Sequence, residues 1–511
     1  MRAHVVFNPC CLRSEFRGTA APKSELVVVV VFCWHALIEI ILQSPTDLLD
    51  IDDITVTRRR IRIVRKLLER SAASFDSLSI SFCVFKDAAA QRDLSTLIQN
   101  TDCVKSLTFT HNELQGDATL TFLMESLKGK RMDEIELNDR SIYGEVGGKF
   151  LKGLVKNVSM KRLRLKYMSF DPPTVRGLCS ALRSTCCTVR ELTLRECWVD
   201  DEMLAMIVEC LCRSPNSSLS KLDLESNSFS PVAVPSLTRL LRNNKSIEKL
   251  ILDRNENIFF GADDATAADF SNALAANTTL RFLSLTLTDL GDTMAIPLFR
   301  ALETNKTLAN LDIEDTFVSV YGYTQFVRSL PFMRGLREVT VGWDDLFDEF
   351  PDSLKAEAME GIKRNESITN WYEVAMCYND DYRTILPFYF ARNRQMIKAR
   401  KILQSPALEE NDAAWKLAVP RMGRHASASS AVFEILRHCL PSHKLLPVTP
   451  LPNSKEVATT KMPSPGVMEE FETTSWTDWS GEDEFMAQVL DQEDVMGPQP
   501  AVAIAYPVYS R

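Results

Sequence analysis

The feature that most constrains this chain is a short apolar pattern that returns at nearly constant spacing along most of its length. Each copy has an apolar residue, two other residues, a second apolar residue, one other residue and a third apolar residue. Ten copies begin at Phe75, Val104, Met132, Met160, Val189, Leu219, Ile247, Leu280, Leu308 and Leu336. Successive copies start 28 or 29 residues apart, except for intervals of 30 before Leu219 and 33 before Leu280, and an eleventh copy near Tyr372 and Val374 has a blurred register. A period of this length indicates a stack of repeated structural units.

The spacing inside each copy predicts its local structure. The last two apolar residues alternate with polar ones, which indicates a short strand with its apolar side chains on one face. The rest of the period has helical spacing, as in Met203, Leu204, Ile207 and Leu211. One strand and one helix cannot bury their apolar faces alone, so neighbouring units must stack. We therefore expect an α/β solenoid with parallel inner strands and outer helices, curved into a horseshoe.

A polar position after the strand brings the pattern close to a known family. Three residues past the last strand leucine, the chain carries Cys83, Asn112, Cys197, Asn227, Asn255 and Cys377. With this position the repeat resembles the ribonuclease-inhibitor-like class of leucine-rich-repeat proteins. The resemblance implies that these side chains hydrogen-bond exposed backbone in the turn that leaves each strand. Five copies depart from it, and their turns should be less regular: Arg140, Met168, Thr288, Thr316 and Asp344.

The repeats divide the chain into four predicted parts. Residues 1–50 form an N-terminal extension, 51–380 the solenoid, 381–446 a helical C-terminal cap, and 447–511 a disordered acidic tail. The cap prediction follows from helical spacing, such as Met396 with Ile397, and from the need to cover an exposed solenoid end. Asn393-Arg394 and Trp415 also resemble a tail that follows such repeats in uncharacterised algal proteins. The last part is rich in Pro, Ser, Thr and acids, a composition that cannot bury enough surface to order itself.

Two N-terminal segments allow alternatives. Leu26 to Leu42 is apolar apart from His35 and Glu39, and basic residues precede it. It is short for a membrane span and Glu39 is costly there, so a buried strand or helix, or a poorly ordered extension, competes with a membrane anchor or targeting segment. Residues 58–66 hold six basic side chains, but Ile61, Val64, Leu67 and Leu68 lie among them at helical spacing. A capping helix with a solvated basic face competes here with a nuclear import signal.

A second set of asparagines also recurs at a constant place in the period. Asn-x-Ser/Thr triplets begin at Asn157, Asn216, Asn244, Asn277, Asn305 and Asn365. Read singly they are glycosylation acceptors, but their constant position favours turn chemistry between helix and strand. The thirteen cysteines form no CxxC pair, which favours reduced thiols and a cytoplasmic protein over zinc sites or disulfides.

No motif for catalysis or for a cofactor occurs, so we expect a binding protein, with no cofactor, no metal and no nucleic-acid partner. Ran GTPase activators are similar in having such repeats and an acidic tail, which makes a GTPase-activating protein one alternative. No arginine of this chain could be matched to the activator's functional one. A membrane-anchored sensor is another alternative, and Leu26 to Leu42 would have to supply its anchor.

The residues between the strand leucines should point to the concave face and form the binding site. On this face Ile251 and Phe282 lie on adjacent strands, which predicts an exposed apolar patch beside Lys249, unless a local loop covers Phe282. Arg162, Arg164 and Lys166 predict a basic strand as a second candidate. The acidic tail carries Trp476, Trp479 and Phe485, which suit either a segment that folds on a second partner or a solubilising tail.

Overall fold

The computed structural model divides the chain into two units, residues 1–442 and 443–511. The residues it describes all belong to the first unit. They are 2–6, 25–29, 48–53, 55–70, 76–85, 87–113, 119–138, 142–213, 218–342, 351–372, 386–387, 389–394 and 396–397.

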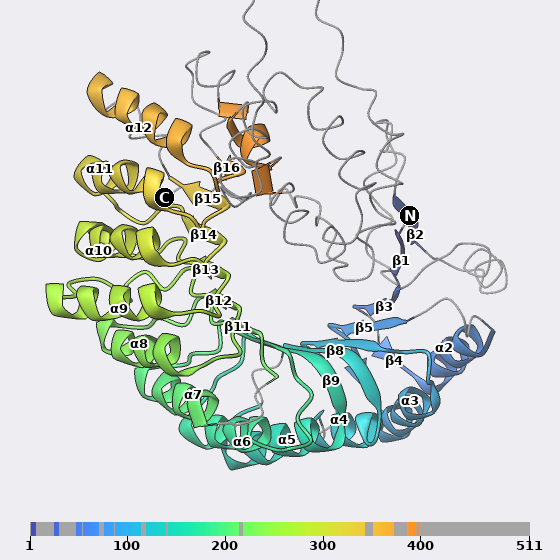
Figure 1. Cartoon of the computed structure of the whole chain (residues 1–511). Coiled ribbons are helices and arrows are strands. Elements are labelled where there is room, and N and C mark those ends of the chain that lie inside the picture. Colours follow the sequence, from blue (N-terminus) through green and yellow to red (C-terminus); the bar gives the residue numbers. More distant parts are fainter. Residues whose placement is uncertain are drawn as a thin grey trace, which may run out of the picture. The chain divides into compact units, whose positions relative to one another are not determined.

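The main feature of this unit is a parallel sheet of twelve strands in sequence order (Figure 1). Its strands are β3 (Leu48–Asp52), β5 (Ser77–Ser81), β7 (Ser106–Thr110), β8 (Arg131–Asn138), β9 (Ser159–Lys166), β10 (Glu191–Arg195), β11 (Lys221–Asp223), β12 (Lys249–Ile251), β13 (Phe282–Ser284), β14 (Asn310–Ile313), β15 (Glu338–Val341) and β16 (Asn370–Tyr372). Each strand pairs with those of the repeats before and after it, as the constant period predicts.

The strand register places one apolar residue of each repeat in a continuous buried row. Leu49 pairs with Leu78, and the row continues repeat by repeat through Leu250 to Val339 and Trp371. Strand β3 adds a copy before the first one identified from the pattern. In β16 the buried residue is Trp371, so the centre of the eleventh copy was misplaced by one residue. Such a shift matters because successive residues of a strand face opposite ways.

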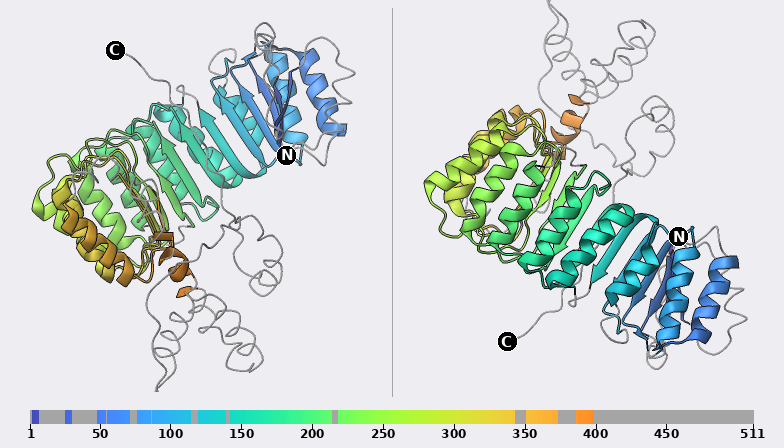
Figure 2. Two further views of the ribbon diagram at one scale, coloured as in Figure 1. Left: turned by 90° about the horizontal axis from the view of Figure 1, so that it is seen from above. Right: turned by 90° about the horizontal axis from the view of Figure 1, so that it is seen from below.

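Helices α2 to α12 cover one face of the sheet, and none of them lies on the other face, as the three ribbon views agree (Figures 1 and 2). They are α2 (Arg58–Arg70), α3 (Ala88–Asn100), α4 (Thr119–Leu127), α5 (Gly144–Asn157), α6 (Pro172–Leu182), α7 (Asp201–Arg213), α8 (Val234–Asn243), α9 (Asp264–Ala276), α10 (Gly291–Thr304), α11 (Val320–Ser329) and α12 (Asp352–Arg364), with short 3₁₀ turns η2 (Pro231–Ala233) and η3 (Leu330–Phe332). Large side chains fill the space between the layers: the Phe299 and Phe326 rings lie 5.0 Å apart, and Phe326 and Trp371 lie 5.4 Å apart. This confirms a mixed α/β fold with a long parallel sheet.

The turn that leaves each strand is held by the Asn or Cys position of the repeat. Asn255 is fully buried, and its Nδ2 donates to the carbonyls of Leu224, Leu252 and Asp253 at 3.1, 2.7 and 3.2 Å. Its Oδ1 accepts from the Asn227 backbone N–H at 2.8 Å. These bonds satisfy backbone groups that no strand or helix pairs. The expectation of hydrogen-bonding Asn side chains in these turns is confirmed.

Cysteine fills the same place with fewer bonds, and threonine does so only locally. Cys197 donates its thiol to the carbonyls of Leu165 and Arg195, while its N–H donates to the Asn227 side chain. Thr288 instead donates to the carbonyl of Leu285, three residues earlier. The residue before this position has a positive φ in every such turn that the structure describes from β5 to β14. Cys377, Arg140 and Asp344 lie outside the described residues.

A second row of asparagines closes the helices. Asn244, Asn277, Asn305 and Asn365 follow the last residues of α8, α9, α10 and α12, and all four are buried. In Asn305, Nδ2 donates to the Leu274 carbonyl at 2.7 Å, and Oδ1 accepts from the N–H groups of Thr307 and Leu308 at 2.8 Å. The predicted turn chemistry is confirmed at these four sites, and Asn216 lies outside the described residues.

The flanking elements are described in part. Residues 26–29 of the apolar segment belong to strand β2 (Glu25–Val29), which pairs in parallel with β1 (Arg2–Val6), and residues 30–42 lie outside the described residues. Two-residue strands β4 (Thr55–Val56) and β6 (Val84–Phe85) form a small sheet of their own. The basic cluster forms helix α2, with Ile61 and Val64 buried and Arg62 exposed, as expected of a solvated basic face.

The described residues between 386 and 397 are helical, which agrees with the helical spacing there. They bind the last described repeat through its free carbonyls. Asn393 Nδ2 donates to Ile368, Arg392 donates to Lys363 and Asn365, and Arg394 donates to Thr369.

Candidate protein-binding surface

The candidate site is the face of the sheet that carries no helices, which we call the open face. Strand residues that alternate with the buried leucines point to this face. The register aligns them in rows across the repeats, so Glu191 of β10 lies beside Lys221 of β11, followed by Lys249 of β12 and Phe282 of β13. The surface is therefore built by many strands with one or two side chains from each.

The N-terminal strands contribute hydroxyl groups. Ser77, Ser79 and Ser81 of β5 align with Ser106, Thr108 and Thr110 of β7. This agrees with the small, polar side chains predicted there.

The basic strand β9 is paired with its acidic neighbour β8. Glu134 lies 2.8 Å from both Arg162 and Arg164, and Lys166 lies 2.8 Å from Glu136. Ion pairs in a half-buried position need this kind of complementary geometry. The three cations predicted as a basic candidate site are thus brought together, but each of them is paired with one of two carboxylates, Glu134 or Glu136.

A second charged group lies on β10 and β11. Arg195 reaches Glu225 at 2.5 Å and Asp223 at 3.5 Å, and Lys221 lies 3.8 Å from Asp223. Asp223 is almost fully buried. Burial raises the pKa of Glu225, an effect that Arg195 opposes. This group also neutralises itself.

The predicted apolar patch is wrong in one respect. Ile251 is only 8 % exposed and pairs with Ser284, so it does not form an exposed surface with Phe282. Phe282 is half-buried, and a side chain of the neighbouring strand lies over it: the Lys249 ammonium is 3.9 Å from the centre of its ring. Burial, and next the nearby Lys221, lower the pKa of Lys249. The site residues Lys249 and Phe282 thus form a cation–π pair.

The C-terminal part of the open face is acidic, and this feature was missed as a site. Its members are Asp253 of the β12 turn, Asp312, Glu314 and Glu338. None of the four lies within ion-pair distance of a Lys or Arg among the residues that the structure describes. The strand alignment could have revealed them, because Glu338 follows Asn310 in one row and Asp312 follows Ser284 in the next.

Two of these carboxyls are held in place by hydroxyl and backbone donors. Asp253 accepts from the Thr286 N–H at 3.1 Å, and the Thr286 hydroxyl donates to Asp312 at 2.9 Å. Burial raises the pKa of Asp253 to about 7, with Asp312 and Glu225 adding to the effect and a bond with Ser284 opposing it. Burial also raises the pKa of Asp312. A cation brought by a partner would stabilise both charged forms.

For the metal, the membrane segment, the tail and the cysteines, the structure describes only part of the residues concerned. Within the described ranges, no group of three or more His, Cys, Asp or Glu side chains could hold a metal ion. No helix among the described residues is long and apolar enough to cross a membrane. Trp476, Trp479 and Phe485 lie outside those residues. The eight cysteines with described environments are free thiols.

Known proteins are similar to parts of this chain. The rat (Rattus norvegicus) protein "Capping protein, Arp2/3 and myosin-I linker protein 3" is 24% identical over 244 residues, covering 47% of this chain and 15% of that protein. "NACHT, LRR and PYD domains-containing protein 5" of Mus musculus is 25% identical over 334 residues, or 62% of this chain and 27% of that protein. "Leucine-rich repeat-containing protein 45" of Gallus gallus is 33% identical over 95 residues, or 19% of this chain and 13% of that protein. The chain spans less than a third of each of these relatives.

Among solved structures, a complex of TLR13 with ssRNA13 matches with a TM-score of 0.34 and 14% identity, over 58% of this chain and 46% of that one. A tropomodulin C-terminal domain from Caenorhabditis elegans matches with a TM-score of 0.28 and 18% identity, over 33% and 98%. Both scores lie below 0.5, so this likeness carries no argument about function. No protein-family model matches the chain. The repeated strand, polar turn and helix, and the similarity to curated leucine-rich-repeat proteins, support a leucine-rich-repeat architecture for this chain.

Proposed function

We propose that this chain is a protein-interaction scaffold that binds a partner through the open face of its sheet, as a cytoplasmic protein of the ribonuclease-inhibitor-like type. The proposal assigns it a binding role and no reaction. Its main support is the acidic group Asp253, Asp312, Glu314 and Glu338, which has no described ion-pair partner although Asp253 and Asp312 are half-buried and burial raises the pKa of both. Burying carboxylates is costly without a compensating charge, and a bound partner can supply one.

The same face offers an apolar contact next to this group. Phe282 lies on β13, between Lys249 of β12 and Asn310 of β14. An aromatic side chain within charged and polar neighbours is a common centre of a protein interface. By contrast, the ion pairs between β8 and β9 would have to be opened before Arg162 or Arg164 could bind an acidic partner. We therefore favour the C-terminal half of the face over the basic strand.

Affinity capture from cells, quantified by mass spectrometry, tests the proposal. The site variant combines Asp312→Asn with Glu314→Gln, and Phe282→Ala is a second, independent one. Asp269→Asn on α9 is the matched control, because it removes an exposed carboxylate from the helix layer. We expect specific partners to be lost from both site variants and kept by the control.

Equal capture by the wild type and both site variants would refute the open face as the binding site. The combination of Phe282→Ala with Ile251→Ser is not a clean test, because Ile251 is buried and its replacement would destabilise the fold. Recovery of a small GTPase would favour the GTPase-activating alternative, and recovery of membrane proteins the sensor.

A further inference from the structure

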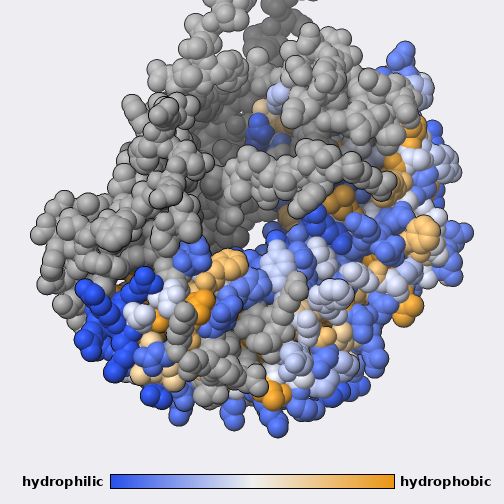
Figure 3. Space-filling view, turned by 180° about the vertical axis from the view of Figure 1, so that it is seen from behind, coloured by the Kyte–Doolittle hydropathy of each residue, from blue (hydrophilic) through white to orange (hydrophobic). Residues whose placement is uncertain are grey.

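Exposed apolar side chains gather along one edge of the solenoid. We call it the strand-end edge: the connections from the end of each main-sheet strand to the following helix, with that helix's first turn. Nine of the ten large, exposed apolar side chains described lie here, and Phe332 is the tenth. They are Phe82, Tyr143, Val146, Tyr167, Trp198, Val232, Phe260, Phe317 and Tyr321. Figure 3 shows how apolar residues stand as separate spots among hydrophilic ones on one face of the molecule.

The row is most continuous from β9 to β14. Tyr167 follows β9, Trp198 follows β10, Val232 follows β11 and Phe260 follows β12. Phe317 and Tyr321 follow β14. Neighbouring strands are about 4.8 Å apart, so the side chains from β9 to β14 cover about 24 Å. This is enough for one extended segment of a partner to contact several of them.

The fold does not require aromatic side chains at these places. Trp198 is 74 % and Phe317 is 81 % exposed, so packing does not hold either one. Both have a positive φ, 56° and 54°, a backbone conformation that bulky residues rarely adopt. Ser228 has the same place and nearly the same φ, 54°, in another repeat. A small polar residue therefore suits the turn, and the aromatic rings at Trp198 and Phe317 call for another cause.

The surroundings of the row are acidic. The described residues between each main-sheet strand and its following helix contain thirteen acids and one base, Arg254. Some of these acids cap helices, as Asp171 and Asp263 do, and the helix dipole offsets their charge. Glu196, Glu256 and Asp315 are exposed. Among the described residues, their side chains cap no helix and form no ion pair.

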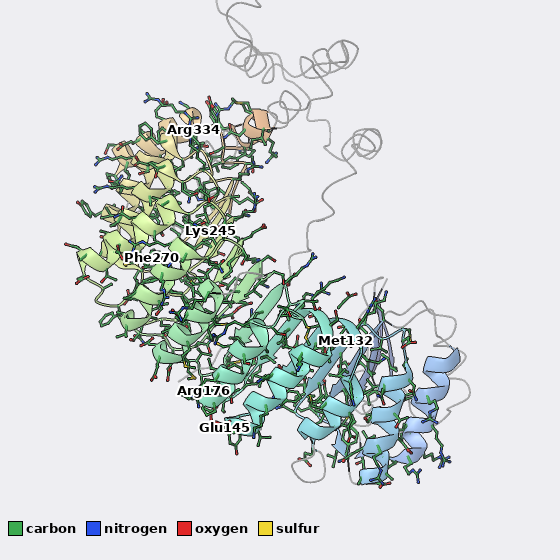
Figure 4. All side chains as sticks on the ribbon, turned by 60° about the horizontal axis from the view of Figure 1, so that its bottom comes forward. Met132, Glu145, Arg176, Lys245, Phe270 and Arg334 are labelled. Atoms are coloured by element: carbon green, nitrogen blue, oxygen red, sulfur yellow. The ribbon has the colours of Figure 1, made fainter. Side chains whose placement is uncertain are left out.

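The opposite edge shows that this charge belongs to one side of the solenoid. The described connections from each helix to the next strand contain ten bases and four acids. Lys245 and Arg334, labelled in Figure 4, lie in two of them. Glu145 and Arg176, also labelled there, belong to α5 and α6 and lie 3.9 Å apart. The strand-end edge thus combines negative charge with exposed rings.

We propose that the strand-end edge, centred on Trp198, Phe260 and Phe317, binds a basic segment of a partner protein in which Lys or Arg alternate with apolar residues. The cations stack on the aromatic rings and pair with Glu196, Glu256 and Asp315, and the apolar residues cover Val232. The edge adjoins the open face where the strands end, but none of these three aromatic or three acidic side chains belongs to the acidic group of the open face. The edge carries no charge complementarity for an acidic partner.

The test measures binding of a labelled twelve-residue peptide that alternates Arg and Leu to the full chain, by fluorescence anisotropy. The aromatic variant combines Trp198→Ser with Phe317→Ser, since serine already occupies the equivalent turn at Ser228. The charge variant combines Glu196→Gln with Asp315→Asn. The control is Phe332→Ser, which removes an exposed ring outside this edge. The acidic C-terminal stretch is present in every variant, so its contribution to binding cancels in the comparison.

We expect the aromatic variant to bind about tenfold more weakly than the wild type, as truncation of central interface aromatics does. The charge variant should also bind more weakly and with less dependence on salt, and the control should stay within about twofold. The proposal is overturned if the aromatic variant binds like the wild type or if the Phe332→Ser control loses as much. It is also overturned if a Glu-Leu peptide binds equally well. If sedimentation shows self-association that the aromatic variant abolishes, the edge is instead an interface between copies of this chain.

Discussion

Replacement of Asn255 by Ala tests how the repeats are held together. The Asn255 side chain makes four contacts at 3.2 Å or less with the backbone of two neighbouring repeats. Its amide nitrogen has two protons, so we count two donated hydrogen bonds and one accepted hydrogen bond for this side chain. Without this side chain the Leu224 carbonyl keeps its bond from Asn227 Nδ2, and the Asp253 carbonyl keeps its bond from the Ser226 N–H. The buried Leu252 carbonyl and Asn227 N–H lose the bonds that Asn255 gives them, at about 1–3 kcal/mol per group. We expect Asn255→Ala to lower the free energy of unfolding by about 3–5 kcal/mol.

A graded series separates the side-chain bonds from packing. Asn255→Thr should recover part of the loss, because Thr288 and Thr316 at this position each donate to the carbonyl three residues earlier, at 2.6 and 2.8 Å. Asn257→Ala, an exposed asparagine of the same connection, should change stability by less than about 0.5 kcal/mol.

Urea unfolding followed by circular dichroism measures these differences, with hydrogen exchange to locate the change. Repeat proteins can unfold segment by segment, so the protection of the β11 and β12 amides should fall more than that of β5. If Asn255→Ala costs under about 1 kcal/mol, or if Asn257→Ala costs as much, the turn asparagines do not stabilise the stack in the way argued.

Three further predictions concern the core, a carboxyl group and the thiols. Leu250 is fully buried, so Leu250→Ala should cost about 2–5 kcal/mol in urea unfolding, and a loss under about 0.5 kcal/mol would contradict its inward position. The folded pKa of Asp253, about 7, is above its ordinary value, so the native state holds the extra proton between those two pH values. Stability should therefore fall as pH rises through this window, and Asp253→Asn should flatten the profile; an unchanged profile in thermal melts from pH 4 to 8 would count against it. Burial raises the pKa of Cys197 to about 12, so its thiol should react with a thiol reagent only after unfolding, and thiol counts with and without reductant should be equal; a gain on reduction would reveal disulfides.

The repeat period alone predicted much of the fold. Leu78, Leu250 and Leu283 were placed in inward-facing strand positions because a stack of equal units buries the same position in each one. The role of Asn305 followed in the same way, since a polar residue at a constant place in a period serves the backbone geometry that all copies share. The role of Asn255 was implied by the resemblance to leucine-rich-repeat proteins. These features depend on local order along the chain, and the sequence displays that order directly.

What the sequence did not show depends on contacts between repeats and at their ends. Trp371 rather than Tyr372 continues the buried row, because the neighbouring strand sets the register of β16. Ile251 has an outward strand position but is only 8 % exposed, and Lys249 lies over Phe282 because adjacent strands bring them together. The same contacts balance Arg162 and Arg164 with Glu134. The pattern of one repeat says which way a side chain points, whereas the side chains of its neighbours, about 4.8 Å away, decide whether it is exposed, paired or free to bind.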